Sequence, residues 1–138
     1  MNMNKRVAIG VIGLLTWGTV TMAQSLEDAR KAVTAEQFQK AKSIFNNLIT
    51  TQPTNAENYY YFGDLYLQLN NPDSAKIIFN KGIAANPKFS LNYIGLGATD
   101  LFAKNVSAAQ ANFDKATADM RKKDYREFIY IGKAYTYE

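Results

Sequence analysis

Residues 56–89 read AENYYYFGDLYLQLNNPDSAKIIFNKGIAANPKF, and the apolar side chains in this segment follow the period of an α-helix twice. From Tyr59 to Tyr66 they lie three or four residues apart, and from Ala75 to Ile83 they do so again. Such a spacing gathers apolar side chains on one face of a helix. The segment therefore predicts two amphipathic helices joined by a short connection.

Asparagine and proline mark where these helices begin and end. Asn71 can accept hydrogen bonds at a helix N-terminus, and Pro72 suits the first helical position, where no backbone N–H is needed. Asn105 precedes a later apolar stretch and can cap the N-terminus of that helix in the same way. The pairs 52–53 and 86–87 end in proline, which disfavours helix in the residue before it. These signals predict helix pairs with sharp boundaries.

Residues of four kinds recur along the chain at an interval of 34. They are Ala41, Ala75 and Ala109; Phe45, Phe79 and Phe113; Ala29, Gly63 and Gly97, with Gly132 following one residue late; and Pro53 and Pro87. A fixed period of this length is typical of stacked structural repeats. Gly63 and Ala75 lack bulk where two antiparallel helices would approach each other, and Phe79 can fill the space beside them. Because glycine weakens a helix by about 1 kcal/mol relative to alanine, close packing is the reason to expect it there.

This pattern resembles the tetratricopeptide repeat, which carries an aromatic residue, Leu-Gly and Tyr in one helix and Ala, Phe, Ala and Pro in the next. The matching residues are Tyr59, Phe62, Gly63, Tyr66, Ala75, Phe79, Gly82 and Pro87; then Tyr93, Leu96, Gly97, Ala109, Phe113 and Ala116; and finally Phe128, Ile131, Gly132 and Tyr135. The resemblance implies an all-α fold of tandem antiparallel helix pairs, stacked as a right-handed superhelix (an α-solenoid) with a concave groove. It divides the chain into repeat 1 (24–55), repeat 2 (56–89), repeat 3 (90–124) and the first helix of an incomplete repeat 4 (125–138).

Three departures from the repeat pattern need an explanation. Ser25 and Asp28 replace apolar residues in repeat 1, as expected of a terminal repeat whose outer side meets solvent. In repeat 3, Asp100 stands at a tyrosine position, and we expect a lysine or tyrosine partner because buried acids nearly always have one. Arg121 replaces the usual proline in a charged segment, residues 121–124, that we expect to be a solvated loop.

Residues 1–23 have the features of a secretory signal peptide. Lys5 and Arg6 give a basic start, an apolar run extends from Val7 to Val20, and small residues precede Gln24. Because the run is shorter than the roughly 20 residues that a spanning helix needs, we expect cleavage, and only transient membrane contact. The alternative is that residues 1–23 are kept as an uncleaved membrane anchor. The signal peptide predicts that the chain is exported, periplasmic or extracellular, and associated with the cell envelope.

The composition excludes several classes of active site. The 138 residues include no cysteine and no histidine, so disulfides, thiolate nucleophiles, imidazole bases and the usual zinc ligands are absent. No carboxylate pair, glycine-rich phosphate loop or metal-ligand spacing recurs. The net charge of +4 owes part of its value to Lys5 and Arg6, so the mature chain is nearly neutral. We therefore expect no enzyme, no cofactor and no nucleic-acid partner.

In tetratricopeptide repeat proteins the first helix of each pair lines the groove, and the resemblance carries this role onto defined positions. The groove residues that it implies are Glu57, Tyr60, Asp64, Leu67 and Gln68 in repeat 2, Leu91, Ile94, Ala98, Leu101 and Phe102 in repeat 3, and Arg126, Ile129, Lys133, Thr136 and Tyr137 in repeat 4. Apolar and aromatic groups flanked by charge suit an extended peptide or a partner helix. Alternatively, Leu101 and Phe102 are core residues packed against an adjoining element.

Two finer inferences concern single positions. Consecutive helical residues point about 100° apart, which predicts Tyr60 in the groove and Tyr61 on the outer surface. Family members that grip a C-terminal carboxylate place Lys and Asn where repeat 1 has Leu26 and Arg30. Repeat 3 lacks the corresponding basic pair as well, so that carboxylate clamp is absent.

These observations predict a non-catalytic interaction module or scaffold that binds a peptide or partner protein in its concave groove. The alternative is the N-terminal repeat region of a larger envelope protein whose catalytic or glycan-binding domain lies beyond residue 138. The last motif belongs to a first helix, so we expect Phe128, Ile131 and Tyr135 to face solvent. We also expect the chain to be a fragment, and a version extended through the next helix to be more stable.

Overall fold

The computed structural model describes residues 24–118 and 126–137, and these residues are almost entirely helical. The elements are α1 (Leu26–Thr34), α2 (Phe38–Thr51), α3 (Ala56–Gln68), α4 (Pro72–Ala85), α5 (Leu91–Phe102), α6 (Val106–Thr117), α7 (Arg126–Ala134) and the short 3-10 helix η1 (Tyr135–Tyr137). The expected signal peptide, 1–23, and the charged loop, 121–124, lie outside the described residues. Within those residues, no helix has both the length and the apolar character needed to cross a membrane.

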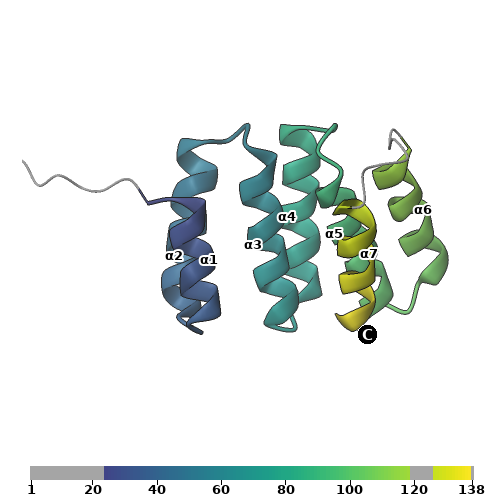
Figure 1. The fold of residues 1–138 in the computed structure, drawn as a ribbon, viewed down its shortest axis with the longest axis horizontal. Helices are drawn as coiled ribbons and strands as arrows, with labels where there is room; N and C mark the ends of the chain where they lie inside the picture. Colours follow the sequence, from purple (N-terminus) through teal and green to yellow (C-terminus); the bar gives the residue numbers. More distant parts are fainter. Residues whose placement is uncertain (1–23, 119–125, 138) are drawn as a thin grey trace, which may run out of the picture.

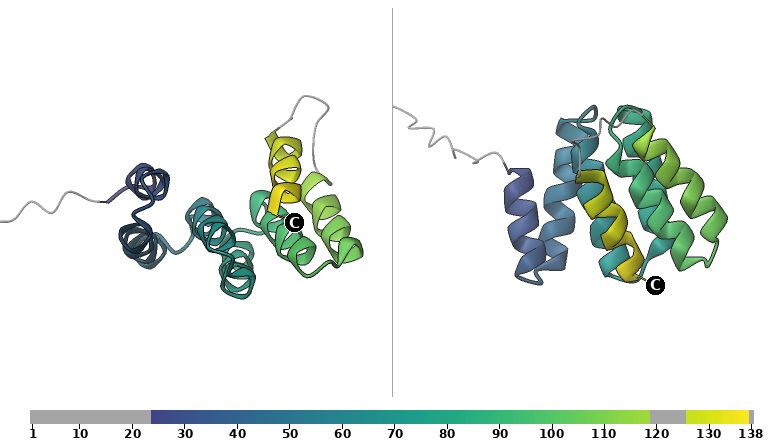
Figure 2. Two further views of the ribbon diagram at one scale, coloured as in Figure 1. Left: turned by 90° about the horizontal axis from the view of Figure 1, so that it is seen from below. Right: turned by 45° about the vertical axis from the view of Figure 1, so that its right-hand side comes forward.

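Helices that follow one another in the sequence pack as pairs along an open array (Figure 1). α1 packs against α2, α3 against α4, and α5 against α6, while α5 also contacts both helices of the pair before it. Viewed end-on, α1, α3, α5 and α7 form one side of the array and α2, α4 and α6 the other (Figure 2, left). The predicted all-α solenoid of stacked helix pairs is confirmed.

Side-chain caps begin two of the second helices, as predicted. Asn71 accepts a hydrogen bond from the backbone N–H of Ser74 at 3.0 Å, and Pro72 occupies the first turn of α4. Asn105 accepts one from the N–H of Ala108 at 3.1 Å at the start of α6. Each cap satisfies an N–H group that a helix N-terminus leaves without a backbone partner.

Glycines of α3 and α5 leave spaces on the helix surface that phenylalanine rings of the next helix fill, and we call each such space a seat. A Cβ on Gly63 would lie 2.4 Å from the ring of Phe79 on α4, and a Cβ on Gly97 would lie 2.3 Å from the ring of Phe113 on α6. Both distances are far below van der Waals contact, so only glycine permits this packing. The prediction that small residues allow the paired helices to approach closely is confirmed.

Asp100 has a partner, although not one of the two kinds predicted. Its Oδ2 accepts a hydrogen bond from Nδ2 of Asn112 on α6 at 2.8 Å. Asp100 is only half-buried, so a neutral amide together with solvent satisfies the carboxylate. The expectation of a lysine or tyrosine partner was therefore wrong.

α7 is placed differently from the preceding first helices. Whereas α5 packs against both α3 and α4, α7 packs mainly against α5 and has few contacts with α6. It stands on the concave side, so that α1, α3, α5 and α7 follow a curve in the end-on view (Figure 2, left). This curvature brings the end of the described chain near the middle of the array.

Candidate functional site

The concave side of the array contains an open cleft between α1 and α7, with α3 at its base. The cleft has a volume of about 420 Å³. Arg30 and Val33 of α1 line one wall, Tyr61 and Asp64 of α3 line the base, and Lys133 of α7 contributes from the opposite wall. Its size lies within the range of about 300–1,000 Å³ that is usual for ligand sites.

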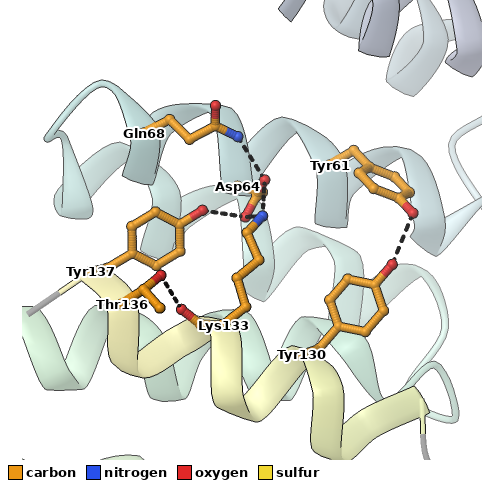
Figure 3. Close-up of polar contacts among 7 residues, drawn as sticks. All are labelled: Tyr61, Asp64, Gln68, Tyr130, Lys133, Thr136 and Tyr137. Carbon is orange, nitrogen blue, oxygen red and sulfur yellow. Dashed lines mark hydrogen bonds and ion pairs between the residues drawn. The ribbon is translucent and has the colours of Figure 1, made fainter. Parts of the chain in front are cut away.

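Asp64 is the polar centre of this region. Its side chain lies on α3 with only 6% of the residue exposed, and Nζ of Lys133 donates to both carboxylate oxygens at 2.8 and 2.9 Å. The hydroxyl of Tyr137 donates to Oδ1 at 2.8 Å, and Nε2 of Gln68 donates to Oδ2 at 2.8 Å (Figure 3). A buried carboxylate needs such partners to remain charged. Asp64 thus ties α7 and η1 to α3.

Two tyrosines form a second link between the same helices. The hydroxyls of Tyr61 on α3 and Tyr130 on α7 lie 3.2 Å apart (Figure 3). Burial, followed by the hydrogen bond with Tyr130, raises the pKa of Tyr61 to about 12. Burial and the neighbouring Asp64 charge likewise raise the pKa of Tyr137. Both phenols are therefore neutral at physiological pH and act as hydrogen-bonding groups.

The N-terminal end of α7 is fixed by Glu127. This buried carboxylate accepts hydrogen bonds from Oγ of Ser90 at 2.7 Å and from the guanidinium of Arg126 at 3.0 Å. Burial alone would raise the pKa of Glu127, but these donors outweigh it and hold the pKa below its usual value. Arg126, a predicted groove residue, is therefore engaged at the helix start.

Most of the predicted apolar groove residues are core residues in this structure. Tyr60, Leu67, Leu91, Ile94 and Leu101 are each no more than 4% exposed. The expectation that they form an accessible groove surface was wrong because α7 and the neighbouring helices cover them. The remaining space between α3, α5 and α7 is about 10 Å³, roughly enough for one water molecule and too small for a peptide side chain.

Residues of α7 and η1 reach α3 across a narrow space beside α5. Gly95 and Ala98 of α5 line this space. Gly95 is itself a seat for the Phe79 ring of α4, because a Cβ at this position would lie 2.3 Å from that ring. The ring of Tyr130 packs edge-on against Tyr60, with centroids 5.3 Å apart.

The other predicted groove residues are distributed around this contact. Glu57 and Gln68 are exposed on α3, and only Gln68 lines the cleft together with Asp64 and Lys133. Phe102 is half-buried and stacks with Tyr137 at a centroid distance of 6.2 Å. Its packing agrees with the alternative that it belongs to the core.

Two cleft residues were missed or misplaced by sequence reasoning. Tyr61 faces the cleft and not the outer surface, because the curved array turns this side of α3 toward α1 and α7. The guanidinium of Arg30 lies over the Tyr61 ring, 4.7 Å from its centroid, although Arg30 was considered only for a carboxylate clamp. The spacing of apolar residues at i, i+3 and i+4 does not reveal how strongly the array curves. Nothing in the sequence therefore indicated that Tyr61 and Arg30 line the cleft.

The arrangement is suited to non-covalent binding. A guanidinium stacked on an aromatic ring is held in place and can accept a carbonyl or carboxylate partner. Asp64, in contrast, already has three donors, so it serves to hold α7 and not to bind a ligand. Among the residues described, no cluster of acidic side chains is arranged to hold a metal ion.

Comparisons with known proteins agree with this architecture. Residues 32–98 match a family model described as tetratricopeptide repeat. Among solved structures, the chain is similar to the first TPR of Spaghetti (RPAP3) bound to the HSP90 peptide SRMEEVD, with a TM-score of 0.67 and 14% sequence identity, covering 80% of this chain and 89% of that one. No curated protein gives a significant match. The repeat spacing, the glycine–phenylalanine seats and the family match together show tetratricopeptide repeats in residues 32–98 of this chain.

Proposed function

We propose that this protein is a non-catalytic interaction module that binds a peptide segment of a partner protein in the cleft between α1 and α7. The observation that carries the proposal is the open concave cleft of about 420 Å³, which has both apolar and charged walls. A tetratricopeptide repeat structure of similar fold was solved with a bound peptide, which supports a peptide as the kind of ligand. Nothing in this proposal requires catalysis.

Arg30 is the polar group best placed to orient such a peptide. Its guanidinium is exposed and held over Tyr61, whereas Lys133 is engaged with Asp64. Val33 and Phe38 lie nearby in the cleft lining and offer apolar contact. The favoured ligand therefore presents a carboxylate or backbone carbonyl to Arg30 and an apolar side chain to the wall beside it.

Selection from a displayed peptide library tests this proposal. We expect peptides selected on the native protein to bind the Arg30→Gln variant at least about tenfold more weakly, because a charge-assisted hydrogen bond is lost. Lys81→Gln removes one positive charge from the exposed surface of α4 and should leave binding unchanged. Failure to select any peptide, or equal binding to both variants, would overturn the cleft assignment.

We also propose that the protein is exported to the periplasm or the cell exterior and remains associated with the envelope. The support is the basic, apolar and small-residue pattern of residues 1–23. Mass spectrometry of the protein isolated from its own cells should show a mature chain beginning at Gln24. An intact chain in the cytoplasmic fraction that still begins at Met1 would contradict the proposal.

A further inference from the structure

The turns between paired helices adopt the same backbone conformation in all three repeats. Glu36, Asn70 and Lys104 lie 34 residues apart, and their φ angles are 56°, 53° and 56°. This left-handed region disfavours most side chains, whereas asparagine and glycine adopt it readily. Repeat 2 therefore carries a residue suited to its turn, and repeats 1 and 3 carry charged residues that are less suited.

The side chain of Glu36 has no part in holding its turn. The backbone N–H of Glu36 donates to the carbonyl of Val33 at 2.9 Å. The N–H of Gln37 donates to the carbonyl of Ala32 at 2.8 Å, and repeat 2 makes the corresponding pair of backbone bonds around Asn70. Glutamate therefore destabilises this turn relative to asparagine and adds no hydrogen bond to it.

Glu36 differs from the other two turn residues in its position. It lines the cleft between α1 and α7, whereas Asn70 and Lys104 are not among the described residues of that lining. Lys104 shows that the fold tolerates a charged residue in this conformation, so the conformation by itself assigns no role to Glu36. The place of Glu36 in the cleft is what points to a role in binding.

Two charged groups in the cleft are available to a ligand. Asp64 and Lys133 pair with each other, which leaves the guanidinium of Arg30 and the carboxylate of Glu36. Both residues are exposed, and neither forms an ion pair with another described residue. They are six residues apart, so they do not face each other as residues three or four apart on a helix would. The cleft therefore presents one positive and one negative group at separate points.

We propose that Glu36 selects peptides that carry a lysine or arginine side chain. The inference rests on the proposed binding of a peptide in the cleft, and it adds a second contact to the one assigned to Arg30. With a basic group on Glu36 and an acceptor on Arg30, the peptide lies in a fixed direction. Six residues of helix span about 9 Å, a distance that an extended peptide covers in about three residues. The basic residue should therefore lie roughly two to four residues from the group that contacts Arg30.

Glu36→Asn tests this role without disturbing the turn. The variant removes the carboxylate and introduces the residue that repeat 2 has at this position, so we expect the Tm to rise by about 2–4 °C. Binding of the selected peptides, measured by isothermal titration calorimetry, should nevertheless weaken about threefold at low salt, because an exposed ion pair is lost. The difference should shrink at about 1 M salt, where exposed charges are screened.

Lys104→Asn is the matched control, because it makes the same kind of change at the equivalent turn of repeat 3. It should raise the Tm to a similar extent and leave binding unchanged.

A double-mutant cycle identifies the group on the ligand. Replacing the basic residue of the peptide with glutamine should weaken binding to the native protein about threefold and should leave binding to the Glu36→Asn variant almost unchanged. Selection on a Glu36→Lys variant should instead yield an acidic residue at that peptide position, because like charges would repel.

Selected peptides that lack a basic residue would overturn this inference. So would equal binding by the native protein and Glu36→Asn, or a glutamine substitution in the peptide that weakens binding to both proteins equally. If Arg30→Gln still weakens binding in such a case, the peptide occupies the cleft and only the role of Glu36 is wrong. If Arg30→Gln has no effect either, the cleft assignment itself fails, and this inference fails with it.

Discussion

Asp64 holds together helices that belong to repeats two positions apart. Its donors Lys133 and Tyr137 lie 69 and 73 residues further along the chain. Since a buried carboxylate is costly when it loses its partners, the attachment of α7 depends strongly on this one side chain. Gln68 lies on the same helix as Asp64, so its hydrogen bond to Oδ2 does not add to the attachment.

Replacing Lys133 with methionine tests this dependence. The variant keeps an apolar side chain of similar reach but leaves Asp64 without its cation. We expect the free energy of unfolding to fall by about 1–2 kcal/mol, less than for a fully buried pair because the Lys133 side chain is 43% exposed. Urea denaturation followed by circular dichroism measures the change.

Lys31→Met is the matched control for that experiment. It removes an exposed ion pair with Glu27, in which the two side chains are 69% and 72% exposed. The free energy of unfolding should change by less than about 0.5 kcal/mol. If both variants lose a comparable free energy of unfolding, the ion pair of the buried Asp64 contributes no more to stability than an exposed ion pair does.

Two glycine-to-alanine substitutions should change the free energy of unfolding in opposite directions. Gly63→Ala forces a Cβ to within 2.4 Å of the Phe79 ring, and we expect a loss of about 1–3 kcal/mol despite the better helix propensity of alanine. Gly132→Ala meets nothing within 4 Å and should stabilise the protein by about 0.5–1 kcal/mol. Thermal unfolding distinguishes them, and a stabilised Gly63→Ala variant would contradict the seat described for Phe79.

The helix pairs could be predicted from the sequence, and the position of α7 could not. Each pair is fixed by local features, such as the cap at Asn71 and the seat at Gly63, which follow from residue type and spacing. The approach of α7 to α3 depends on how strongly the array curves. Gly95 and Ala98, which line the space between α3 and α7, have the spacing of ordinary core positions, and that spacing does not specify the curvature. The cleft residue Tyr61 was misplaced for the same reason.

The docking of α7 should weaken at alkaline pH. The pKa values of Tyr61 and Tyr137 are raised in the folded state, mainly by burial. A group of this kind contributes its full stability below its unfolded pKa of about 10, and that contribution is lost as the pH rises through the folded pKa. We expect the free energy of unfolding to fall between pH of about 10 and 12, as measured by urea denaturation. Tyr137→Phe should show a shallower fall, and an unchanged slope would contradict this role for Tyr137.

The whole molecule combines two kinds of contact. In most repeat arrays each unit contacts only its neighbours, so the stability is a sum of local terms. Here α7 also reaches α3, through the Asp64 and Tyr61 contacts. The C-terminal helix therefore contributes to the stability of the second repeat as well as the third, and it forms one wall of the cleft.

Ending the chain at residue 118 tests this contribution. Without α7, side chains such as Tyr60, Ile94 and Ala98 lose their cover, and we expect a loss on the order of 3 kcal/mol with a lower Tm. The shortened protein should also bind the dye ANS, which reports exposed apolar surface. An unchanged Tm together with no gain in dye fluorescence would show that α7 adds nothing to the core.

The separation of 69 residues between Tyr61 and Tyr130 also bears on how the protein folds. Contacts within helix pairs join residues close in sequence and form rapidly, whereas a contact spanning two repeats requires a large loop to close. Docking of α7 should thus follow formation of the first three pairs. Substitutions at this contact would then accelerate unfolding and leave the folding rate almost unchanged, so the lifetime of the folded state is set at its C-terminal helix.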